Sequence, residues 1–155
     1  MDLLSGPVSA VCFVPVPTAR MSHGVRIACI ALAGTVGALG MLGHRRGGIT
    51  ELFAAAGRLV TPGAPESAAV LLGLAIHVIW IALWSALLAA FTQPDRRSRT
   101  SIAAVIVAAL ALAASLVVSA VVVGPLGTLS LAARTVAHVV LAVSFIIGMR
   151  LAPQG

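Results

Sequence analysis

The chain alternates long apolar runs with short polar connections, and four of the runs are long enough to cross a lipid bilayer as helices. The run at residues 68–91 contains no Asp, Glu, Lys or Arg. About 20 apolar residues in a helix span the hydrocarbon core of a membrane. The sequence therefore predicts an all-α polytopic membrane protein, a four-transmembrane-helix bundle with spans at about residues 25–42, 68–91, 101–123 and 131–150.

The longest connection, residues 44–67, carries an apolar pattern of its own. Its apolar residues recur at helical spacing, with Glu51 and Arg58 off the stripe: Ile49, Leu52, Phe53, Ala56, Leu59 and Val60. This pattern predicts an amphipathic helix at residues 49–60 that is too short to span the bilayer. We expect it to lie in the membrane interface between the first two spans. A lid over the bundle is the alternative.

Residues 1–20 lack the marks of a signal peptide, and an upstream extension before a start at Met21 is the alternative reading of them. They have no basic start, and Pro7, Pro15 and Pro17 interrupt their apolar part. We expect residues 1–24 to be a disordered tail and residues 25–151 to form a single four-helix transmembrane domain.

Glycine recurs every three residues in the first span, at Gly34, Gly37, Gly40 and Gly43. In lipid, small residues on one face of a helix let a neighbouring backbone approach closely. The pattern favours a packing face, and a channel-lining glycine face is the alternative.

Composition excludes a soluble domain, because only 9% of the residues are charged and 60% are hydrophobic. A soluble domain carries about a quarter charged residues. All ten basic residues are arginines at the ends of apolar runs, and no basic face with interleaved aromatic residues exists. The lipid bilayer is therefore the expected partner, and nucleic acid is not.

The arginines also predict the orientation of the chain. One side of the membrane receives Arg20, Arg26, Arg96, Arg97, Arg99 and Arg150, and the other receives Arg45, Arg46, Arg58 and Arg134. Because arginine is enriched on the cytoplasmic side, we expect both termini to be cytoplasmic.

The second span carries a stripe of unusual side chains. Its members lie at offsets 0, 4, 7 and 11: Gly73, His77, Trp80 and Trp84. At about 100° per residue they fall within a wedge of about 60° on one helix face. We expect this packing stripe to face protein, with an interfacial position facing lipid as the alternative for Trp84.

The fourth span repeats the offsets of this stripe. Arg134, His138, Leu141 and Phe145 also lie at offsets 0, 4, 7 and 11. The match suggests a two-helix duplication that relates the first two spans to the last two. A coincidence within an apolar background is the alternative.

One hydrogen-bonding side chain falls at a similar depth in each span. Thr35, His77, Ser115 and His138 lie about 10–14 Å below the outer ends of their helices, at 1.5 Å per residue. We predict a polar intramembrane layer of these four inside the bundle, with Arg134 one turn above His138. The layer is a candidate ligand or proton site. The alternative is structural, with each group bonded to a neighbouring carbonyl or hydroxyl.

Four spans, an amphipathic segment after the first and a Gly-x-x-x-His motif in the second resemble a group of small bacterial inner-membrane proteins. These are the uncharacterised four-helix proteins of the domain-of-unknown-function type. The resemblance is carried by Gly73, His77, Trp84 and His138, within about residues 25 to 150. It implies a location in the bacterial cytoplasmic (inner) membrane and no particular activity.

The sequence favours a non-enzymatic membrane component that packs with itself as a homo-oligomer or with a larger membrane partner. One alternative is a small transporter or channel-like protein that uses a buried His77 and His138 site. It would lack the intramembrane carboxylate of most proton- or cation-coupled carriers. A second alternative is a redox module that holds haem between the same histidines.

No motif for enzymatic chemistry is present. The chain has no Gly-x-Ser-x-Gly, no phosphate-binding loop, no paired carboxylates and no His-Glu-x-x-His. Cys12 and Cys29 have no neighbours with metal-ligand spacing. We therefore expect no enzymatic activity, no catalytic residue, no metal site and no cofactor.

Overall fold

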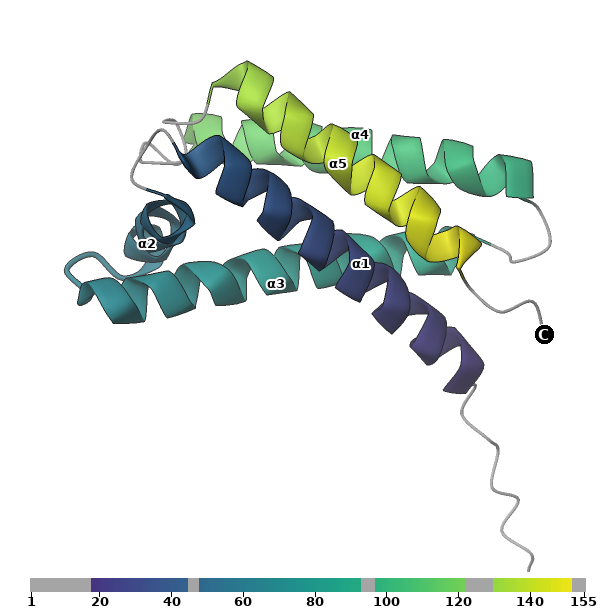
Figure 1. Cartoon of the computed structure of the whole chain (residues 1–155), viewed down its shortest axis with the longest axis horizontal. Helices are drawn as coiled ribbons and strands as arrows, with labels where there is room; N and C mark the ends of the chain where they lie inside the picture. The colour runs from purple at the N-terminus through teal and green to yellow at the C-terminus, as the bar shows by residue number, and fades with distance from the viewer. Residues whose placement is uncertain (1–17, 45–47, 93–96, 122–129, 152–155) are drawn as a thin grey trace, which may run out of the picture.

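The computed structural model describes residues 18–44, 48–92, 97–121 and 130–151. Within these residues the chain forms helices and no strand, which confirms the all-α prediction (Figure 1). The helices are α1 (Thr18–Gly43), α2 (Ile49–Val60), α3 (Glu66–Phe91), α4 (Arg97–Val121) and α5 (Leu131–Arg150).

Four of the described helices are long and apolar enough to cross a membrane, so the chain is a four-helix transmembrane bundle. Their membrane-length stretches are His23–Gly43, Glu66–Phe91, Ser101–Val121 and Leu131–Arg150. The shorter α2 lies between the first two, as predicted. Helix α1 begins at Thr18, inside the expected tail of residues 1–24. Residues 1–17 of that tail lie outside the described residues.

The four long helices form a ring in the order α1, α3, α4, α5. Helix α1 packs on α3 and α5, and α4 packs on the same two helices. The beginning of α1 and the end of α5 lie at the same end of the bundle, because Arg26 Nη1 donates a hydrogen bond to the Leu151 carbonyl at 2.8 Å. In the ring, α3 and α5 stand diagonally opposite each other.

A tightly packed core occupies the half of the bundle that contains this Arg26–Leu151 contact. Its buried residues come from all four long helices: Ile27, Ala31, Ile81, Leu88, Ala104, Val107, Ala111, Leu141 and Phe145. Gly34 of α1 faces Ser144 of α5, and Gly148 of α5 lies against Ile27 of α1, so small residues let these two helices approach closely and raise the van der Waals contact that stabilises helix pairs in lipid.

The other half of the bundle is more open, and α2 lies there (Figure 1). Helix α2 is seen nearly end-on in that view, so it runs across the direction of the long helices. In the same half, α3 diverges from α4 and α5 toward the end at which α2 packs (Figure 1).

Backbone contacts hold α2 against α3. A Cβ atom added to Gly57 would lie 1.9 Å from the Ala69 carbonyl oxygen, and one added to Gly73 would lie 1.9 Å from the Phe53 carbonyl oxygen. Any side chain at either glycine would overlap the facing backbone. The glycines therefore set the close approach of α2 to α3.

The buried face of α2 differs from the predicted apolar stripe. The helix buries Phe53, Ala54 and Gly57, whereas Val60, which belongs to the stripe, is 64% exposed. Contact between backbones favours the small residues Ala54 and Gly57 over larger apolar ones. Periodicity identified the helix correctly, and the size of the side chains selected the face that packs.

Replacing Gly73 by Ala should destabilise the protein, because the new methyl group overlaps the Phe53 carbonyl. We expect a loss of about 1–3 kcal/mol and a lower melting temperature in detergent. Gly37→Ala is the matched control, since nothing lies within 4 Å of its Cβ position. That change should be neutral or stabilising by up to about 1 kcal/mol. Equal melting temperatures for the two variants would refute the close α2–α3 contact.

Candidate functional site

A cavity of about 270 Å³ lies in the open half of the bundle, and all five described helices contribute to its wall. This volume is close to the lower end of the roughly 300–1,000 Å³ range of small-molecule pockets. Most of the wall is apolar: Leu39, Leu52, Phe53, Ala55, Ala56, Gly73, Ile76, Trp80, Ile81, Val118, Ala137 and Leu141. The cavity thus suits a small and largely apolar ligand.

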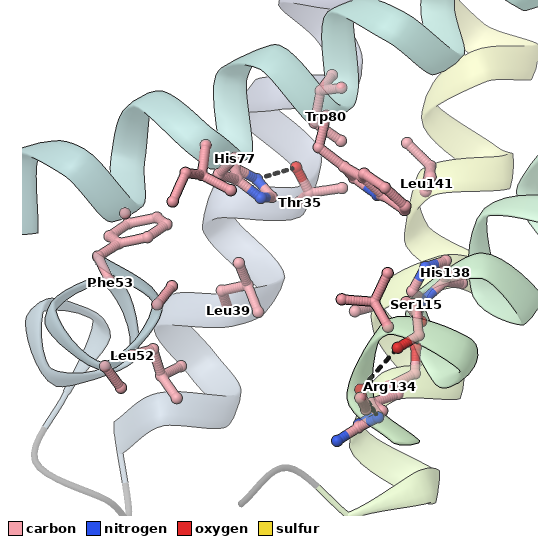
Figure 2. A pocket seen from close by; sticks show the side chains of 18 residues that line it. Thr35, Leu39, Leu52, Phe53, His77, Trp80, Ser115, Arg134, His138 and Leu141 are labelled. Carbon is pink, nitrogen blue, oxygen red and sulfur yellow. Dashed lines mark hydrogen bonds between the residues drawn. The ribbon is translucent and has the colours of Figure 1, made fainter. Parts of the chain in front are cut away.

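The polar side chains of the wall gather on two opposite sides of the cavity (Figure 2). Thr35 and His77 form one side, and Ser115, Arg134 and His138 form the other. These are the five residues that the sequence assigned to a polar intramembrane layer, and all of them line this one cavity. Their similar depth along antiparallel helices, together with the rotation of each helix, places them around the same cavity.

The Thr35–His77 pair joins α1 to α3. Thr35 is buried, and its Oγ1 lies 2.8 Å from the Ala31 carbonyl and 3.0 Å from His77 Nε2. A hydroxyl has one proton, so a Thr35 hydroxyl that donates to Ala31 accepts from His77. This network assigns the proton of the neutral ring to Nε2 and leaves Nδ1 of His77 as an acceptor.

His138 has the opposite tautomer. Its Nδ1 lies 2.8 Å from the Arg134 carbonyl oxygen, one turn earlier on α5. A carbonyl only accepts, so Nδ1 carries the proton and donates it. Nε2 of the neutral ring is then left as an acceptor, and His138 is one of the residues that line the cavity.

Arg134 is held at the cavity wall by α4. Its Nη1 donates a hydrogen bond to Ser119 Oγ. Ser119 in turn donates to the Ser115 carbonyl at 2.6 Å, and Ser115 donates to the Leu112 carbonyl at 2.8 Å. Sequence analysis did not assign Ser119 to the layer. Its position one turn after Ser115 was the available signal.

The remaining stripe residues lie next to the layer. Gly73 and Trp80 line the cavity, and Trp84 packs against the core and meets Trp80 edge-on, with ring centroids 5.6 Å apart. Trp80 extends toward Leu141 (Figure 2). Both follow the histidines by about one turn, so they close the cavity on the side of the packed core.

Two polar atoms near the closed end of the cavity are buried and lack a hydrogen-bond partner among the described residues. They are Trp84 Nε1 and Ser85 Oγ. An unpaired buried donor costs about 1–3 kcal/mol. The indole N–H of Trp84 has no acceptor within the described part of the chain.

Helix α2 supplies a wall that the sequence did not assign to the site. The Phe53 ring lies against the His77 imidazole, with centroids 5.7 Å apart and planes tilted by 53°. Leu52, Ala55 and Ala56 line the cavity beside it. The angle at which α2 docks on α3 decides these contacts, and periodicity contains no information about that angle.

The wall combines hydrogen-bond donors and acceptors without acidic groups. None of the lining residues is Asp or Glu, and the described residues contain no cluster of three His, Cys, Asp or Glu that could hold a metal ion. The polar groups of the wall are therefore one guanidinium, two imidazoles and several hydroxyls, and apolar side chains surround them. Such a set can orient a ligand through hydrogen bonds and charge.

Comparison of the chain with protein-family models, with curated proteins and with solved structures finds no match. The resemblance to small bacterial inner-membrane proteins therefore stays a prediction.

Replacing Thr35 by Val keeps the shape of the side chain and removes the acceptor for His77 Nε2–H. We expect the variant to lose about 0.5–2 kcal/mol of stability, measured as a lower melting temperature in detergent. Thr35→Ser keeps the hydroxyl and should melt near the wild type. If Thr35→Val melts no lower than Thr35→Ser, the hydrogen bond between α1 and α3 contributes nothing.

Proposed function

We propose that the chain is a non-enzymatic, multi-pass protein of the bacterial cytoplasmic membrane that binds a small amphipathic molecule in the cavity between its helices. The observation that carries this proposal is the composition of the cavity wall. Apolar side chains from every described helix surround polar groups that lie on two opposite sides. Binding pockets combine these features, namely an apolar lining with a few convergent polar groups.

The packed half of the bundle supports this proposal. Ala111 and Phe145 are fully buried at 0% exposure, so the same four helices reach close packing a short distance from the cavity. A role in packing alone would be served by closing the other half in the same way. Instead, that half contains polar groups, which are costly in hydrocarbon unless they are paired.

The role of a packing or accessory component stays a prediction. The long helices expose many apolar side chains, among them Leu71, Ile79 and Val139. Lipid covers such surfaces as well as a protein does, so they select neither a homo-oligomer nor a larger partner. The transporter hypothesis includes the proposed binding step and adds movement of the ligand across the membrane.

The haem hypothesis also stays a prediction, and the hydrogen bonds of the two histidines bear on it. His138 has the arrangement common for iron ligands, with Nδ1–H bonded to a carbonyl and Nε2 left as an acceptor. His77 bonds Thr35 through Nε2, the atom that would otherwise bind iron. A Soret absorption band in the purified protein would support haem binding.

We propose further that both termini are cytoplasmic. Arg134 lines the cavity, whereas none of the other nine arginines is among the cavity-lining residues. Without Arg134, the arginine count is six on the side of the termini and three on the opposite side. The cavity then lies in the outer half of the membrane.

Reporter fusions test this orientation. Alkaline phosphatase, which is active only outside the cytoplasm, should be active when it is fused after Gly63, between α2 and α3. A fluorescent protein that matures in the cytoplasm should fluoresce when it is fused after Thr92, at the end of α3. The reverse pattern would invert the topology, and reporters on the same side would contradict the span between them.

Filling the cavity tests the binding function. Ala137 lines the cavity, and Ala132 lies on the same helix, is exposed and is absent from the cavity wall. Native mass spectrometry of the protein from its own membranes should detect a small-molecule adduct on the wild type and on Ala132→Phe. Ala137→Phe should lose at least nine-tenths of this adduct because the ring occupies its space. An adduct that Ala137→Phe retains in full would locate binding elsewhere.

A further inference from the structure

The polar groups on the α5 side of the cavity are specific enough to indicate the chemistry of the ligand. We infer that the ligand is an amphipathic carboxylic acid whose acid group binds between Arg134 and His138 and whose apolar tail extends toward Trp80. This inference rests on the proposed function, because it names the class of molecule that the cavity binds.

The two residues form a matched donor and acceptor. Arg134 and His138 are one turn apart on α5, and residues at this spacing have Cβ atoms about 5–6 Å apart. A guanidinium presents N–H groups in a planar arrangement that fits a carboxylate. His138 Nε2 accepts the proton of the neutral acid or, when the ring is protonated, donates to the carboxylate.

Hydrogen bonds to the helices hold both groups in place. The Nδ1–H of His138 bonds the Arg134 carbonyl, which fixes the ring and directs Nε2 away from its own backbone. Nη1 of Arg134 bonds Ser119, which holds the guanidinium against α4. A group that is already oriented loses little conformational freedom when a ligand binds.

The charge of the wall selects acids over bases. Its ionisable side chains are Arg134, His77 and His138, which come from α3 and α5. The cavity-lining residues of α1, α2 and α4 carry no ionisable group. A cationic ligand would therefore meet an arginine and no carboxylate, whereas an anionic one would be attracted.

The depth of these groups matches an amphipath that enters from the outer leaflet. Arg134 lies in the first turn of α5, so an acid group bound there stays close to the membrane surface. Trp80 and Leu141 close the cavity deeper in the membrane, and Leu141 lies about 10 Å below Arg134 along α5. Between these levels the wall offers apolar contacts for a tail.

Tryptophan fluorescence can test the inference directly. The chain has two Trp and no Tyr, so Trp84→Phe leaves Trp80, in the cavity wall, as the sole emitter. In lipid vesicles, this variant is titrated with 8-bromooctanoic acid, 8-bromooctan-1-ol or (8-bromooctyl)trimethylammonium, whose bromine quenches a nearby indole. We expect the acid to quench Trp80 saturably, at least tenfold more tightly than the alcohol, and octanoic acid to compete. The ammonium probe should produce only the unsaturable quenching that comes from partition into the bilayer.

Variants assign the acid group to its two partners. Arg134→Gln and His138→Gln should each weaken binding of the acid about tenfold or more. The exposed neighbour Thr135→Val should leave it unchanged. Because Arg134→Gln also removes a contact with α4, Ser119→Ala is included. It loses the same hydrogen bond but keeps the guanidinium, so it should weaken binding of the acid less than Arg134→Gln does.

The outcomes separate the inference from the proposed function. If the alcohol or the ammonium probe saturates Trp80 quenching as tightly as the acid, the cavity binds ligands but the inferred class is wrong. The same holds if folded Arg134→Gln and His138→Gln proteins bind the acid as well as the wild type does. If no probe quenches saturably and Ala137→Phe retains its adduct, both the inference and the proposed function fail.

Discussion

The contact between α2 and α3 has backbone at its centre, and the open half of the bundle depends on it. Gly57 meets the Ala69 carbonyl, and Gly73 meets the Phe53 carbonyl, at separations that leave no room for a Cβ atom. Helix α2 is thereby held across the ring of long helices and presents Phe53 to the cavity. With a larger residue at either glycine, α2 would move away from α3 and the cavity would lose this wall.

The second constraint is the cost of polar groups away from water. Thr35, Ser115 and Ser119 each donate to a carbonyl of their own helix, which satisfies the hydroxyl proton locally. Their oxygens can still accept hydrogen bonds. The Thr35 oxygen accepts from His77, and the Ser119 oxygen accepts from Arg134. These hydrogen bonds within each helix lower the free-energy cost of placing the polar layer in a membrane. They also determine which histidine ring nitrogens are left to bind a ligand.

The ring order of the helices bears on the predicted duplication. A two-helix repeat would relate α1 to α4 and α3 to α5, and each of these pairs is diagonal in the ring. His77 and His138 then lie on the two diagonal helices, on opposite sides of the cavity. Only the first pair of spans is joined through a helix of its own, α2, among the described residues. The duplication stays a prediction, and its two halves would differ most at this wall.

The sequence alone determined the number of spans, the position of the short helix and the depth of the polar residues. Helix length and bilayer thickness fix these features, and both can be counted along the chain. Depth along antiparallel helices brings Thr35, His77, Ser115, Arg134 and His138 to similar levels, and the rotation of each helix turns these residues toward one cavity. The tertiary structure decided which groups bond, which face of α2 is buried and why the half that contains α2 stays open. Those features depend on crossing angles and close approaches between helices, such as the contacts of Gly57 with the Ala69 carbonyl and of Gly73 with the Phe53 carbonyl, which periodicity does not encode.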